Sequence, residues 1–271
     1  MTIGLLAKAA LFPCHVWLPP AHANAPAPVS ALLSALVVKG SFLILVRLWT
    51  EAYANIVTAE AFSALGYLGA AAVLWGALQA IVQQRLKMLV AYSTVAQLGY
   101  LFMALPLTAS HPGAWSGILM LLAAHALAKT ALFLAAGNIL KAAGHDVLSK
   151  LGPILPRLPI TVFAIGLAGI SIIGLPPSGG FLGKWLLLGV AIDSGFFWIA
   201  LIFVAGSLLA SVYVFKIIAL AFSGEDLADG ERFHSPPKLM EWTAFALALV
   251  AVGLGLASEA PLHLISLEGE G

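Results

Sequence analysis

The chain has 271 residues, 61% of them hydrophobic and only 9% charged, whereas a soluble domain carries roughly 25% charged residues; the composition indicates an integral membrane protein. The net charge of +1 excludes nucleic acid as a main partner, because no basic stripe is available to neutralise phosphates. The one cysteine, Cys14, excludes an internal disulfide or a cysteine-ligated cluster, and no flavin or haem motif is present, so we expect no cofactor in this chain.

Apolar segments long enough to cross a bilayer follow one another along the chain. A hydrocarbon core of about 30 Å requires about 20 residues per helix, and with a partial segment at the start there are about eight segments. This pattern predicts an all-α integral membrane protein with a single transmembrane domain of residues 1–271. The segments are 1–18 (partial), 28–49, 56–82, 89–107, 114–140, 159–192, 196–222 and 239–260.

Residues 1–27 are predicted to be a truncated, broken helix followed by a loop. The opening MTIGLLAKAALF lacks the basic leading region of a signal peptide and carries Lys8 inside its apolar run. Prolines from Pro13 to Pro28 then interrupt the apolar stretch. The remaining parts are predicted to be core helices (28–222), a charged cytoplasmic loop (223–238), and the last helix with a tail (239–271).

The stretch GLPPSGGFLGKWLLL, residues 174–188, interrupts the segment 159–192. Prolines lack the backbone donor and glycines relax the chain, so we predict a helix that unwinds and restarts within the membrane. In lipid such a break survives only when it is buried in protein or lines a wet cavity. With the ionisable Lys184 it has the usual construction of an ion site in a transporter. The alternative is a short loop between two half-length arms, with Lys184 reaching the membrane surface.

Basic residues in the connections predict the orientation. Those on one side are Arg85, Lys87, Lys141, Lys150, Arg157, Arg232 and Lys238. The other side has only Arg47, so we expect a multi-pass protein of a bacterial or archaeal inner membrane with an external C-terminus. Tryptophans at the outer helix ends agree with this orientation: Trp49, Trp115 and Trp198. The loops expected in the cytoplasm are 19–27, 83–88, 141–158 and 223–238.

Five lysines lie within apolar segments: Lys8, Lys39, Lys129, Lys184 and Lys216. A charge at the bilayer centre costs about 2.5–3.5 kcal/mol on insertion scales, so chance does not explain several of them. Lys216 lies near the cytoplasmic end of its helix, and we expect its side chain to reach the headgroups. Lys39 and Lys129 lie too deep for that, which favours a buried functional role.

His125 and Lys129 are four residues apart and therefore share one helix face, where they could exchange a proton. The alternative is a histidine bonded to a backbone carbonyl. Glu60 and Glu241 lie near helix ends, so the buried lysines must be largely neutral or find a counter-charge outside this chain. Lysine can release its proton and arginine cannot, which indicates a proton path. It is not a metal site, because metals prefer carboxylate, imidazole or thiolate ligands.

Four blocks together resemble the antiporter-like membrane subunits shared by respiratory complex I (NADH-quinone oxidoreductase chains L, M and N), multisubunit cation/proton antiporters and membrane-bound hydrogenases. The blocks are LLAKAALFPCHVWLPPAHANAPAPVSALLSALVVKG, KMLVAYSTVAQLGY, HALAKTALFLAAG and GLPPSGGFLGKW. The family has about fourteen helices in two inverted repeats, and this chain resembles the second part, from within the seventh helix to the fourteenth. The resemblance assigns the proton path to Lys8 (broken seventh helix), Lys39 (eighth), His125 and Lys129 (eleventh) and Lys184 (broken twelfth).

Two departures from the family pattern affect this reading. The family's lysine on the seventh helix pairs with a glutamate on the fifth, and this chain has no fifth helix. Some members carry a second histidine where this chain has Leu121. We therefore expect a fragment, a split gene product or a truncated chain.

The resemblance implies a non-redox, proton-translocating subunit of a complex I-related assembly. Lys39, His125 and Lys129 would relay protons to Lys184, and Lys8 would couple to an acid outside the chain. Quinone reduction in other subunits would supply the energy, so the expected partners are other membrane subunits, including the missing N-terminal helices, and the lipid bilayer. The alternatives are a subunit of a multisubunit Na⁺/H⁺ antiporter or of a membrane-bound hydrogenase, a quinone-binding redox enzyme, and an inert scaffold.

Overall fold

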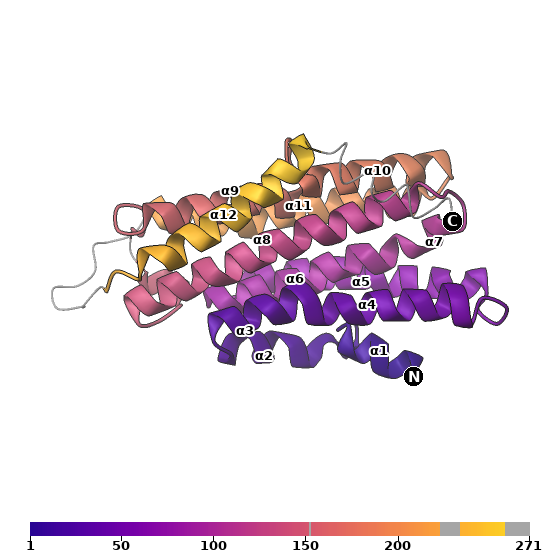
Figure 1. Ribbon diagram of the computed structural model, residues 1–271, viewed down its shortest axis with the longest axis horizontal. Coiled ribbons are helices and arrows are strands. Elements are labelled where there is room, and N and C mark those ends of the chain that lie inside the picture. Colours follow the sequence, from indigo (N-terminus) through magenta and orange to yellow (C-terminus); the bar gives the residue numbers. More distant parts are fainter. Residues whose placement is uncertain (152, 223–233, 258–271) are drawn as a thin grey trace.

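The computed structural model describes residues 1–151, 153–222 and 234–257, and its regular elements there are all helical (Figure 1). The all-α prediction is confirmed. The α-helices are α1 (Thr2–Lys8), α2 (Leu18–Asn24), α3 (Ala27–Leu32), α4 (Val38–Arg47), α5 (Ala59–Val82), α6 (Leu86–Met103), α7 (Leu105–Thr108), α8 (Ala114–Ala143), α9 (Pro159–Ile173), α10 (Gly179–Asp193), α11 (Phe197–Phe222) and α12 (Lys238–Leu256). The short elements are η1 (Cys14–Trp17), η2 (Leu33–Val37), η3 (Leu48–Ala52) and η4 (Leu148–Lys150).

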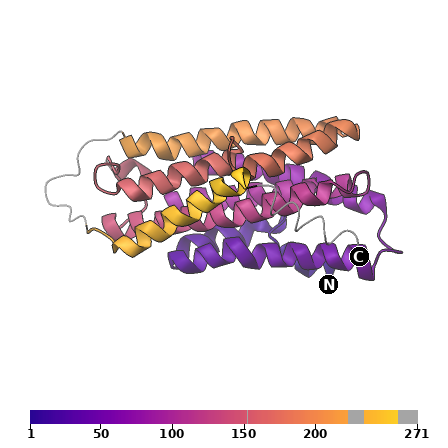
Figure 2. The same cartoon turned by 45° about the horizontal axis from the view of Figure 1, so that its top comes forward.

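Within the described residues, 6 continuous helical stretches are long and apolar enough to cross a membrane. They are Ala27–Ala52, Ala59–Val82, Leu86–Thr108, Ala114–Ala143, Phe197–Ala219 and Lys238–Leu256. Each matches a predicted segment to within a few residues. The two remaining predicted segments are broken: one contains α1, and the other is divided into α9 and α10, which follow one another along α11 (Figure 2).

The predicted loop 19–27 is wrong, because α2 occupies most of it. Pro19 and Pro20 lie in the first turn of α2, where the missing N–H costs nothing since those groups have no partner within the helix. Pro28 lies in the first turn of α3 in the same way. The prolines therefore start two short helices, and the reversal between them is confined to Ala25 and Pro26.

The connections fall at the two ends of an elongated bundle (Figure 1). Those after α2, α5 and α8 lie toward one end, which we call the basic end because it carries Arg85, Lys141 and Lys150. Those after η3, α7 and α10 lie at the other end. Residues 223–233 of the predicted charged loop lie outside the described residues, but α11 ends and α12 begins at the basic end, where His234 N donates to Ala142 O at 2.9 Å.

Small residues bring the central helices α5 and α6 into close contact. A methyl group at Gly99 would lie 2.7 Å from Val73 N, and one at Gly69 would lie 2.5 Å from Met103 N, so neither position has room for a side chain. Close backbone approach of this kind favours helix association where lipid supplies no hydrophobic driving force. It fixes α6 at the centre of the bundle, with nearly all of its residues buried.

Candidate functional site

Lys39 lies in a helix that contains a π-helical turn. α3, η2 and α4 run on without a break, and η2 (Leu33–Val37) is the π-helical turn. Lys39 is buried, and its Nζ donates to Ser34 O within this turn at 2.7 Å. Single π-helical turns inside α-helices are frequent at functional sites. The structure therefore places Lys39 in the bundle interior, as predicted, bound to its own helix.

The Ser34 hydroxyl makes a separate hydrogen bond, to the central helix α6. Ser34 Oγ and Thr94 Oγ1 of α6 lie 3.2 Å apart in a hydrogen bond. Thr94 Oγ1 also donates to Val90 O at 3.2 Å, one turn back on the same helix. Both side chains are fully buried.

Lys129 of α8 approaches the same carbonyl from the other side. Its Nζ donates to Val90 O at 2.9 Å and also contacts Ser93 Oγ. Val90 O thus accepts from both Thr94 and Lys129. Lys39 and Lys129 thus bind polar groups of the same small cluster: Lys39 binds the Ser34 carbonyl, the Ser34 and Thr94 hydroxyls bond each other, and Lys129 shares Val90 O with Thr94.

His125 lies one turn before Lys129 on α8 and is also buried. Among the described residues, neither of its ring nitrogens has a hydrogen-bond partner, so the bond to a backbone carbonyl that we considered is not formed. The imidazole interacts electrostatically with Lys39, Lys129 and Lys184. It therefore lies within electrostatic reach of both Lys39 and Lys129 and of the broken helix.

The Lys184 side chain lies at the break between α9 and α10 and binds the end of α9. α9 ends at Ile173 and is capped by Gly174, whose φ of +87° is the left-handed conformation that glycine adopts easily. α10 begins at Gly179 and is capped by Ser178, whose hydroxyl accepts from Phe181 N at 3.1 Å. Lys184 Nζ donates to the end carbonyls Ile172 O (3.1 Å) and Ile173 O (3.0 Å). The predicted broken helix is present.

Two further groups complete the surroundings of Lys184. Its Nζ donates to Ser207 Oγ of α11 at 3.0 Å and lies 4.4 Å from the centre of the Tyr100 ring, which is a cation–π distance. Lys184 is only 7% exposed, so the alternative in which it reaches the membrane surface does not hold. An apolar cavity of about 320 Å³ adjoins it between α10 and α11, with the exposed Trp185 and Leu208 among its lining residues.

Lys8 is separate from the other predicted site residues. It is the last residue of α1, its side chain is exposed, and it makes no hydrogen bond or ion pair within the described part of the chain. The structure therefore brings together Lys39, Lys129, His125 and Lys184, which we call the polar row. It leaves Lys8 on the outer face of α1.

Lys216, which we expected to reach the headgroups, is bound instead to the end of α5. Its Nζ donates to Ile81 O at 2.7 Å and to Gln83 O at 2.8 Å. The last carbonyls of a helix have no partner within it, so a neighbouring ammonium satisfies them. Its role is structural, and it lies outside the polar row.

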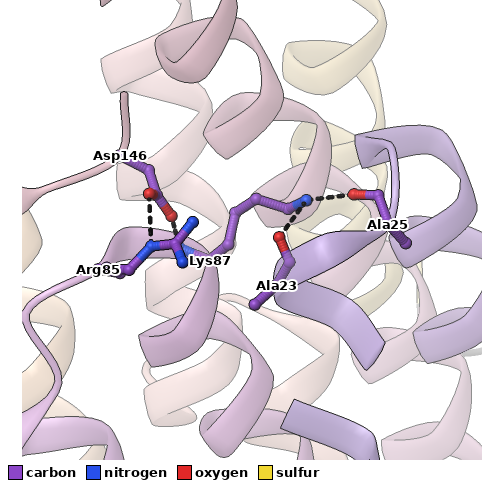
Figure 3. Close-up of polar contacts among 5 residues, drawn as sticks. All are labelled: Ala23, Ala25, Arg85, Lys87 and Asp146. Carbon is purple, nitrogen blue, oxygen red and sulfur yellow. Dashed lines mark hydrogen bonds and ion pairs between the residues drawn. The ribbon is translucent and has the colours of Figure 1, made fainter. Parts of the chain in front are cut away.

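Sequence reasoning missed a polar cluster at the basic end, where Lys87 was counted as a loop charge (Figure 3). Lys87 is 1% exposed, and its Nζ donates to Ala23 O at 3.3 Å and also to Ala25 O, at the end of α2. Its backbone N donates to Asp146 Oδ2 at 3.2 Å, while Arg85 Nε forms an ion pair with Asp146 Oδ1 at 2.9 Å. A basic residue at a helix start gives no sign in sequence of pointing inward.

One of the two glutamates placed near helix ends from the sequence is buried. Glu241, in the first turn of α12, is buried and accepts from Thr161 Oγ1 at 2.9 Å. Asn138 Nδ2 donates to the same hydroxyl at 3.3 Å. These bonds join α8, α9 and α12 near the basic end.

A helical membrane bundle with broken helices and ionisable side chains inside it is the construction of an ion-translocating membrane protein. Residues 1–210 match the family model described as "NADH:quinone oxidoreductase/Mrp antiporter, TM", and the chain belongs to this family. The resemblance noted in the sequence is confirmed.

Curated relatives are subunits of NADH-quinone oxidoreductase. The chain is 38% identical over 236 residues to NADH-quinone oxidoreductase subunit N of Desulforudis audaxviator, covering 86% of this chain and 46% of that protein. It is 32% identical over 271 residues to NADH-quinone oxidoreductase subunit L of Rickettsia bellii, covering 98% of this chain and 40% of that protein. The chain thus spans less than half the length of these two relatives.

Solved structures share the fold. One is the Mrp complex from Dietzia sp. DQ12-45-1b, with a TM-score of 0.86 and 23% identity over 97% of this chain and 57% of that chain. Another is respiratory complex I from Thermus thermophilus with bound aureothin, with a TM-score of 0.77 and 26% identity over 96% of this chain and 56% of that chain. The likeness to the Mrp chain, at this identity, shows the fold alone.

Proposed function

We propose that this chain is a proton-translocating, antiporter-like membrane subunit of a complex I-related respiratory assembly. The observation that carries the proposal is the burial of Lys39, Lys129, His125 and Lys184 inside one helical bundle, with no carboxylate paired to them among the described residues. Buried lysines are costly in a membrane and are retained there for function. A hydroxyl group can both donate and accept, so Ser93 Oγ beside Lys129 and Ser207 Oγ beside Lys184 would suit proton transfer to and from these amines.

Protons would move along the polar row in steps. Lys39 and Lys129 form the inner pair, and His125 lies within electrostatic reach of both and of Lys184. Lys184 would exchange its proton at the break, where Ser207 and the ends of α9 hold its amine. Each amine binds and releases one proton, and no other bond changes.

Energy and the remaining groups would come from other chains. The named relatives are subunits of NADH-quinone oxidoreductase, so we propose that electron transfer in neighbouring subunits drives the transport. The family description also covers Mrp antiporters, which makes a cation/proton antiporter subunit the second candidate; a membrane-bound hydrogenase subunit is a third. The exposed Lys8 would pair with an acid outside this chain. The basic end would face the cytoplasm.

The first prediction compares two lysines of α8 in the assembled complex. Lys129→Met removes the buried amine, so proton pumping in vesicles should fall by about tenfold or more. Lys141→Met removes an exposed lysine near the end of the same helix and should leave pumping normal. Complex amount, measured in the same membranes, separates transport from assembly. Normal pumping by Lys129→Met would contradict the proposed function.

A further inference from the structure

The apolar cavity beside Lys184 opens on the outer surface of the bundle. It has a volume of about 320 Å³ and lies between α10 and α11. Three large side chains of its lining are mostly exposed: Trp185 (61%), Leu208 (65%) and Phe215 (58%). Pockets for small organic ligands measure about 300–1,000 Å³, so this one has room for a ligand. In a membrane protein such an opening faces lipid, and a ligand would enter from the bilayer.

The shape and lining of the cavity suit an alkyl chain. Its α11 residues run from Phe203 to Phe215, which at about 1.5 Å per residue is a length of about 18 Å. The rings of Phe181 and Trp185 on α10 stack with their centres 5.8 Å apart, and both line the cavity. A linear hydrocarbon chain therefore fits this surface in shape and polarity. The aliphatic residues of the lining are Ile173, Leu175, Leu188, Val204 and Leu208.

Among the described residues that line the cavity, Lys184 alone is charged, and it lacks a counter-charge. Its Nζ donates to Ile172 O, Ile173 O and Ser207 Oγ, which are all neutral acceptors. A carboxylate would stabilise an ammonium here strongly, because the attraction between opposite charges grows as the effective dielectric falls. Ser207 can turn to give up its place on the amine, and its hydroxyl can then donate to the carboxylate.

The depth of Lys184 selects the kind of acid. α10 ends at Asp193, so at about 1.5 Å per residue Lys184 lies about 14 Å inside that end of the helix. A hydrocarbon core is about 30 Å thick, which places the amine near its middle. A phospholipid phosphate stays charged and remains in the headgroup layer, because a charge at this depth is costly. A free fatty acid becomes neutral when it takes up a proton, so it can enter the core.

We propose that this cavity binds a free long-chain fatty acid from the membrane. The carboxylate pairs with Lys184 Nζ and accepts from Ser207 Oγ, and the alkyl chain lies along α11 against the rings of Phe181 and Trp185. An acid that arrives neutral gives its proton to a neutral amine, while a carboxylate pairs with the ammonium directly. The same ion pair forms from either state, and no other bond changes.

A bound fatty acid would regulate the polar row, and this consequence rests on the proposed function. The carboxylate stabilises the ammonium form of Lys184, so the amine releases its proton less readily. Fatty acid in the cavity should therefore slow pumping. Binding itself needs only the cavity and the amine, so it can be measured separately from transport.

The first measurement is binding by the assembled complex in vesicles, with a photoreactive palmitic acid that carries a diazirine in its chain. Illumination should label peptides of α10 or α11. Unlabelled palmitic acid should compete for the site, and methyl palmitate, which has no charge, should compete about tenfold less well. Equal competition by the acid and the ester would overturn the inference, because the cavity would then hold an acyl chain only.

A matched pair of variants locates the site. Leu208→Trp places a larger side chain in the cavity and should reduce labelling by about tenfold or more. Leu201→Trp makes the same change at a position of α11 that is 67% exposed and lies outside the cavity lining, and should label like wild type. Val204→Trp, also in the lining, repeats the test if Leu208→Trp does not assemble. Equal labelling of the cavity variant and Leu201→Trp would also overturn the inference.

The second measurement is proton pumping with and without palmitic acid, each variant being compared with its own rate without acid. Fatty acids also carry protons across lipid, but this leak is the same for every variant. Palmitic acid should therefore slow Leu201→Trp more than Leu208→Trp, and equal slowing would overturn the regulatory consequence. Specific labelling together with normal pumping by Lys129→Met would support the fatty-acid site and remove the proposed function. Loss of pumping in Lys129→Met without specific labelling would do the reverse.

Discussion

At the scale of single residues, Lys184 has two roles that one substitution can separate. Its amine holds the end carbonyls of α9 and binds Ser207, and we propose that it also carries protons. Lys184→Arg keeps the positive charge and the donors but retains its proton at every physiological pH. Pumping by the assembled complex should therefore fall nearly as far as in Lys184→Ala.

Lys216→Arg is the matched control, because Lys216 also donates to two carbonyls at the end of a helix. There the role is structural, and arginine should be tolerated. Near-normal pumping by Lys184→Arg would show that Lys184 only binds the end carbonyls of α9, as Lys216 does for α5.

The lysines of the polar row could be predicted from sequence because a charge inside an apolar run stands out. Their partners could not. Serine and threonine are ordinary residues in membrane helices, so nothing marked Ser34, Thr94 or Ser207, whose roles depend on which helices pack together.

At the scale of elements, the break between α9 and α10 depends on Gly174. A side chain there would adopt an unfavourable left-handed conformation, and its Cβ would lie 2.8 Å from Lys184 Cδ. We expect Gly174→Ala to destabilise the folded chain by about 1–2 kcal/mol, with a lower thermal unfolding midpoint in detergent. Gly166→Ala, in the interior of α9 with open space at its Cβ, should not lower it. Equal midpoints for the two variants would show that the break does not need glycine.

The orientation of the bundle can be tested at its two ends. On a background with Cys14→Ser, a cysteine at the exposed Ser149 lies at the basic end, and one at the exposed Ser110 lies at the other. An impermeant thiol reagent added to intact cells should modify Ser110→Cys and spare Ser149→Cys, because basic connections stay in the cytoplasm. The opposite pattern would invert the topology.

Most helix bounds could be predicted from sequence, because hydropathy and length define a spanning segment well. The exceptions have local causes. Pro19 and Pro20 signalled a loop but start α2, since proline fits the first turn of a helix. The π-helical turn η2 could not be predicted, because its residues are ordinary helix formers and neighbouring helices decide where a turn widens.

At the scale of the whole molecule, the polar row lacks acidic partners. Within the described residues, no carboxylate lies in an ion pair with Lys39, Lys129 or Lys184, and Lys8 is exposed. The purified chain in liposomes should therefore show no proton flux above that of protein-free liposomes when a pH gradient is applied. The intact complex in the same lipids is the control. Rapid flux through the isolated chain would mean that it needs no partner.

The π-helical turn at Leu33–Val37 also determines what the deletion of one codon would do to this helix. Such a turn accommodates one extra residue while the helix on either side keeps its register. Deleting one codon within it should therefore produce a regular α-helix in which α3 and α4 still face the same neighbours. The cell would retain an assembled chain, but the Ser34 carbonyl would no longer stand where the Lys39 amine binds it.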